Sequence, residues 1–100
     1  MDKHWRERVE PFFEELLPEF EENLLRESAQ LAGLLESGAL EDLGRIAHKI
    51  KGSAGYFNLT ELGQLARTLE MQCKAGDRAA AAASIETWQA LVGKLELRSV

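Results

Sequence analysis

Apolar residues recur at helical spacing along nearly the whole chain, and no segment is predicted to form a strand. Pro18 suits the first turn of a long helix, and Gly38 follows its end. The turns at Ser37-Gly38 and Gly76-Asp77 are short, and short loops make consecutive helices antiparallel neighbours. The sequence therefore predicts an all-α fold, an antiparallel up-down-up-down four-helix bundle.

The 100 residues are enough for one domain with a single core, residues 1–100. The bundle is expected over about residues 18–97, with an additional short N-terminal helix over about 9–17. Asn58 and Glu61 have the spacing of a capping box at the start of the third long helix, and Asp77 caps the fourth.

The second long helix carries a histidine on a face that is almost free of side chains. Gly44, Gly52 and Gly55 fall within roughly 40° of His48 on a helical wheel. The opposite side carries an apolar stripe for the core: Leu43, Ile46, Ile50, Ser53, Ala54 and Phe57. Each glycine inside a helix costs about 1 kcal/mol relative to alanine. A bare face that lowers helix stability indicates that something large must approach the imidazole.

The run around His48 resembles the histidine phosphotransfer (HPt) domain of bacterial two-component phosphorelays. Its signature is a histidine followed three and four residues later by lysine and glycine, here Lys51 and Gly52, and then by small residues, here Ser53, Ala54 and Gly55. The resemblance covers essentially the whole chain. It implies a protein that accepts a phosphoryl group on His48 from an aspartate of one receiver domain and passes it to another.

The residue types suit this chemistry. A neutral imidazole is a good nucleophile and forms a phosphoramidate when it attacks a phosphoryl group. Lys51 lies one helical turn from His48, where its charge can stabilise phosphoryl oxygens. Arg45 and Lys49 lie on the flanks and are expected to meet an acidic partner surface, as are Gly44, Gly52 and Gly55.

Half of an active site is missing from the sequence. It has no glycine-rich nucleotide loop, and Glu41 is the only carboxylate expected on the face of His48, so no acidic cluster is predicted to hold Mg²⁺. The other histidine, His4, does not complete a metal site, because Cys73 is expected on the core side of another helix. We expect a phosphocarrier without autonomous kinase activity and without a cofactor or metal of its own. In the resembled family the receiver domain supplies the Mg²⁺ and the acidic pocket.

Composition excludes several other classes of partner. The net charge of −5 argues against nucleic acid, and no segment is apolar for long enough to span a membrane. The charged N-terminus is unlike a signal peptide, and the single cysteine, Cys73, cannot form an intramolecular disulfide. We expect a monomeric cytoplasmic protein whose partners are receiver domains of response regulators or hybrid sensor kinases.

Alternatives with related or different functions remain open. A histidine-kinase dimerisation domain usually has an acidic residue directly after its histidine and a proline shortly afterwards. Here Lys49 follows His48, and no proline occurs after Pro18, which counts against a kinase dimerisation domain and against autokinase activity. The chain could also be the phosphoacceptor P1-type module of a chemotaxis-like kinase, or a helical adaptor that is never phosphorylated. The sequence does not decide between a free-standing relay protein and a module of a larger kinase.

Overall fold

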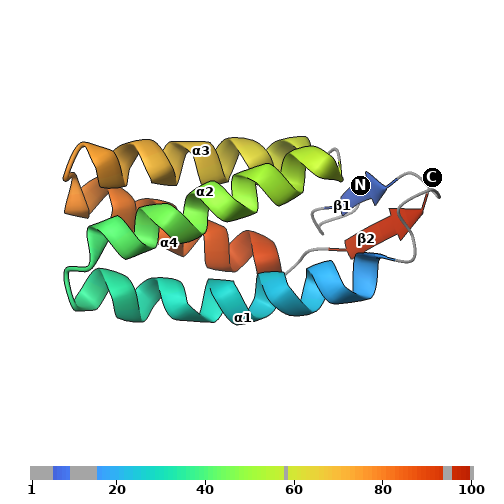
Figure 1. The fold of residues 1–100 in the computed structure, drawn as a ribbon, viewed down its shortest axis with the longest axis horizontal. Coiled ribbons are helices and arrows are strands. Elements are labelled where there is room, and N and C mark those ends of the chain that lie inside the picture. The colour runs from blue at the N-terminus through green and yellow to red at the C-terminus, as the bar shows by residue number, and fades with distance from the viewer. Residues whose placement is uncertain (1–5, 10–15, 58, 94–95, 100) are drawn as a thin grey trace.

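Four helices form the body of the computed structural model, which describes residues 6–9, 16–57, 59–93 and 96–99. The helices are α1 (Leu17–Glu36), α2 (Leu40–Tyr56), α3 (Thr60–Lys74) and α4 (Arg78–Gly93). Successive helices run antiparallel, and α4 returns to pack against α1, so the four helices close around one core (Figure 1). The predicted all-α four-helix bundle is confirmed.

The turns between the helices follow from two glycines. Gly38 and Gly76 adopt φ values of 76° and 70°, a left-handed conformation that glycine adopts without steric cost. At the start of α4 the backbone N–H of Ala80 donates a hydrogen bond to Asp77 Oδ1 at 3.0 Å, which confirms the predicted cap. The predicted capping box depends on Asn58, which lies outside the described residues.

The core is built from one apolar stripe on each helix. Leu24 and Leu31 of α1, Leu43 of α2, Leu69 of α3 and Trp88 of α4 are almost fully buried. The same core buries Cys73, and burial raises the pKa of its thiol.

One polar contact crosses this core. The Trp88 indole N–H donates a hydrogen bond to the buried Ser28 hydroxyl at 2.8 Å. This contact gives the polar atoms of both side chains a partner where water is excluded, and it joins α4 to α1.

The two ends of the described chain add a feature that the sequence analysis does not predict. Strands β1 (Arg6–Val9) and β2 (Glu96–Ser99) pair in parallel beyond the end of the bundle where α1 begins (Figure 1). The last helix therefore ends at Gly93, earlier than the expected limit of about 97. The alternation of Leu95, Glu96, Leu97 and Arg98 suits a strand better than a helix. Val9 belongs to β1, and residues 10–15 of the expected short helix lie outside the described part.

Candidate functional site

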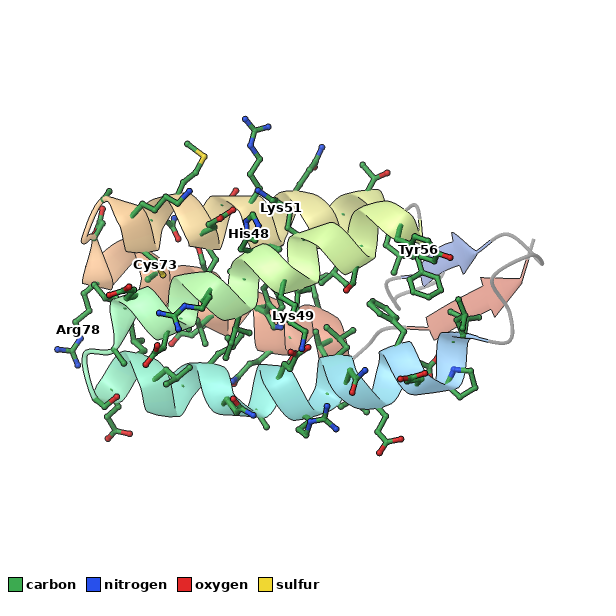
Figure 2. All side chains as sticks on the ribbon, viewed as in Figure 1. His48, Lys49, Lys51, Tyr56, Cys73 and Arg78 are labelled. Carbon is green, nitrogen blue, oxygen red and sulfur yellow. The ribbon has the colours of Figure 1, made fainter. Side chains whose placement is uncertain are left out.

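His48 lies near the middle of α2, on the side of that helix that faces α3 (Figure 2). The buried residues Ala47 and Ala54 are small, so α2 packs closely on α3, while His48 turns outward with 66% of its side chain exposed. The predicted exposure of the imidazole is thus present in the structure.

A nearly buried carboxylate from α3 holds the imidazole. Glu70 Oε2 lies 2.7 Å from His48 Nδ1, and Glu70 Oε1 accepts a hydrogen bond from Lys51 Nζ at 2.8 Å. Lys74 Nζ, one turn further along α3, lies 3.5 Å from Oε2. Only 7% of the Glu70 side chain is exposed, so these three groups replace most of its water. His48 and Lys51, one turn apart on α2, therefore meet on the same carboxylate.

The charge on Glu70 decides which nitrogen of His48 carries the proton. The hydrogen bond from Lys51 is the main cause that lowers the pKa of Glu70 from 4.5 to about 2. The hydrogen bond with His48 and the charges of Lys51 and Lys74 act in the same direction and outweigh burial, which raises the pKa. At neutral pH Glu70 is therefore ionised and can only accept hydrogen bonds, so Nδ1 must be the donor. In the neutral imidazole this leaves the lone pair on Nε2.

The other two predicted cations on α2 are engaged elsewhere. Lys49 Nζ lies 2.8 Å from Glu27 Oε2 of α1, on the side of α2 away from His48 (Figure 2). Arg45 lies 3.4 Å from carboxylate oxygens of both Glu41 and Asp42 within α2. The structure therefore brings Lys51, but not Lys49, to the carboxylate that contacts the imidazole.

The three predicted glycines have different surroundings. Gly52 and Gly55 are exposed, and a Cβ atom at either position would meet nothing within 4 Å. A Cβ atom at Gly44 would lie 3.2 Å from the Cβ of Cys73, which is closer than ordinary van der Waals contact. Gly44 therefore lets α2 and α3 approach each other, while Gly52 and Gly55 leave the surface beside His48 bare.

Glu70 is the site residue that the sequence analysis missed. It follows the core residue Leu69, comes four residues after buried Ala66 and precedes Cys73 by three residues. A charged residue at the border of an apolar stripe is seldom buried without a partner. The position of Glu70 beside the apolar stripe was therefore a signal of a buried carboxylate with a partner. The sequence alone did not identify His48 and Lys51 as its partners.

Two hollows flank the pair of His48 and Glu70 along the junction of α2 and α3. The first, of about 390 Å³, has Leu40, Gly44 and Cys73 in its lining and reaches His48 and Glu70. The second, of about 260 Å³, has the small residues Ala54, Gly55 and Gly63 in its lining, with Lys51 and Arg67. We call them the Cys73 hollow and the Arg67 hollow. The surface around the imidazole is thus indented on both sides.

The described part of the chain has neither a cluster of metal ligands nor a membrane span. No group of three His, Cys, Asp or Glu side chains in that part of the chain is placed to hold a metal ion. None of its helices combines the length and the apolar character needed to cross a membrane.

A family model described as Hpt domain matches residues 15–97, which include all four helices. No curated protein and no solved structure matches the chain.

Proposed function

The chain belongs to the Hpt domain family, which makes it a histidine phosphotransfer module, and from this premise we propose that His48 is its phosphoacceptor. In this proposal His48 takes the phosphoryl group from a phosphorylated aspartate of one receiver domain and delivers it to the aspartate of another. The 2.7 Å contact between His48 Nδ1 and the ionised Glu70 is the observation that supports it best. That contact holds the imidazole in the tautomer whose Nε2 is free to attack.

The transfer step needs no proton to leave the histidine. The Nε2 lone pair attacks phosphorus, the bond between phosphorus and the aspartate oxygen breaks, and that aspartate departs as a carboxylate. Nδ1 keeps its hydrogen, and the positive charge that develops on the ring is stabilised by the Glu70 carboxylate. The second transfer is the reverse of the first, with another aspartate as the attacking group.

Lys51 supplies the cation that the chain contributes to the phosphoryl group. It is 37% exposed and lies one turn from His48, so its ammonium group can move from Glu70 toward phosphoryl oxygens. The receiver supplies Mg²⁺ and the acidic pocket in this proposal. Because no nucleotide-binding motif occurs in the sequence, we also propose that the chain neither binds ATP nor phosphorylates itself.

A labelling experiment tests the assignment of His48. Wild type, His48→Gln and Lys49→Gln are each incubated with radioactively phosphorylated receiver domains and Mg²⁺. We expect label on wild type and on Lys49→Gln that is lost in mild acid and stable in alkali, and no label on His48→Gln.

Label that persists in His48→Gln would show that another residue is the acceptor. A wild-type chain that binds receivers but takes no label from any of them would favour the adaptor function. Labelling by ATP in the absence of a kinase would contradict the proposal that the chain is only a carrier.

A further inference from the structure

The Arg67 hollow contains an arginine that has no acidic partner in the lining. Lys51 and Arg67 line it together with uncharged residues, and no carboxylate does. Thr60, the first residue of α3, also lies in its wall, so the N-terminus of α3, whose first turn carries Glu61, borders the hollow. Lys51 is paired with Glu70, which lies outside this lining, so Arg67 is the cation of the hollow that has no carboxylate beside it, on a chain with a net charge of −5.

Arg67 differs from the other lysines and arginines on the four helices. Each of the others has a bonded or ion-paired group: Arg26 with Asn23, Arg45 with Glu41 and Asp42, Lys49 with Glu27, Lys51 and Lys74 with Glu70, and Arg78 with the Glu36 carbonyl. Arg67 is exposed and has no such group among the described residues. Its guanidinium therefore keeps its donors available for another molecule.

The Cys73 hollow, on the other side of Glu70, gives a contrast. Its cations Arg45 and Lys74 are matched by Glu41 and Glu70 in the same lining. It reaches His48, whereas the Arg67 hollow does not include His48 in its wall. Arg67 therefore lines a hollow beside the imidazole whose wall does not include His48.

We propose that the Arg67 hollow receives an acidic side chain of the receiver domain, and that Arg67 determines which receivers dock well. This inference rests on the proposed function, which makes a receiver the partner that covers His48. The small residues Ala54, Gly55 and Gly63 leave room for the incoming side chain, and Arg67 can hold its carboxylate through two parallel hydrogen bonds. Receivers without an acid at that point would leave the guanidinium uncompensated, which lowers their affinity.

Binding and transfer are measured separately to test this. Unphosphorylated receiver domains are titrated by calorimetry into wild type, Arg67→Gln, Arg67→Glu and Arg67→Lys, at low and at high salt. Arg26→Gln on α1 is the matched control, because Arg26 is also an exposed arginine but lies outside both hollows.

For the best-binding receiver we expect the Kd to rise about threefold in Arg67→Gln and about tenfold in Arg67→Glu. Arg67→Lys should lie between wild type and Arg67→Gln, and Arg26→Gln should match wild type. The difference between wild type and Arg67→Gln should shrink at high salt, because salt screens exposed charges.

An unchanged Kd in Arg67→Glu would overturn the inference. So would an unchanged Kd in Arg67→Gln combined with slower transfer at saturating receiver, because Arg67 would then act on the phosphoryl group. Failure of the proposed function gives a different result: no receiver labels wild type at His48, whatever the titrations show.

Discussion

Helix α2 is joined to its two neighbours by similar ion pairs that have different consequences. Toward α1, Lys49 reaches Glu27, and toward α3, Lys51 reaches Glu70, both at 2.8 Å. Both carboxylates are nearly buried, with 12% and 7% of their side chains exposed. Only Glu70 also contacts a histidine. The same kind of contact therefore serves packing on one side of α2 and orients the proposed phosphoacceptor, His48, on the other.

The largest expected difference between the two sides is in the transfer rate. Glu70→Ala removes the acceptor of the Nδ1 proton, so the imidazole can adopt the other tautomer, whose Nε2 lacks a free lone pair. We expect Glu70→Ala to slow phosphotransfer about 10- to 100-fold at saturating receiver. Glu27→Ala should stay within about twofold of wild type. Rapid-quench kinetics with a phosphorylated receiver measure both, and equal losses in the two variants would remove the distinction between the two carboxylates.

The glycines give a second comparison, this time in stability. Gly52→Ala should raise the free energy of unfolding by up to about 1 kcal/mol, because helix propensity improves and the added methyl group meets open space. Gly44→Ala gains the same propensity but places its Cβ 3.2 Å from the Cβ of Cys73, so α2 and α3 must move apart.

Urea unfolding of the two glycine variants should therefore place Gly44→Ala at least about 1 kcal/mol below Gly52→Ala. Equal stabilities would mean that α2 and α3 leave enough room for a methyl group at Gly44.

A larger side chain at the open position, as in Gly52→Gln, should leave the fold intact and slow phosphotransfer by obstructing the approach of the receiver domain.

The smallest effect is expected in the pH dependence of stability. Because the pKa of Glu70 is about 2 in the folded protein and 4.5 without its partners, Glu70 stabilises the fold above about pH 4.5. That contribution is lost as the pH falls through about 2. Urea unfolding at a series of pH values should show the advantage of wild type over Glu70→Gln at pH 6 shrinking as the pH drops below about 4. A difference in unfolding free energy that stays constant with pH would show that the neighbours of Glu70 do not lower its pKa.

The sequence predicts the parts of the site that lie within one helix. His48 and Lys51 are one turn apart, so their common face follows from the helical repeat alone. The contact with Glu70 joins residues 22 positions apart on two helices, and it depends on how α3 is rotated against α2. The role of Gly44 depends in the same way on the distance between helices, which hydrophobic spacing does not specify.

The ends of the chain illustrate the same limit. The pairing of β1 with β2 joins the first and last described segments, and each strand has only four residues. Signals for such short segments are weak, and parallel pairing across a whole bundle has no local cause in the sequence. The helices are predictable because each has an apolar stripe long enough to be recognised.

The most direct test of the account is the protonation pattern of His48 itself. Long-range proton–nitrogen NMR spectra of nitrogen-15-labelled protein at about pH 8, above the ordinary pKa of histidine, distinguish the two neutral tautomers. We predict that wild type carries its proton on Nδ1 and, after phosphorylation, the phosphoryl group on Nε2, and that Glu70→Ala shifts toward the other tautomer. A proton on Nε2 in wild type, or a phosphoryl group on Nδ1, would contradict the claim that Glu70 prepares His48 for attack.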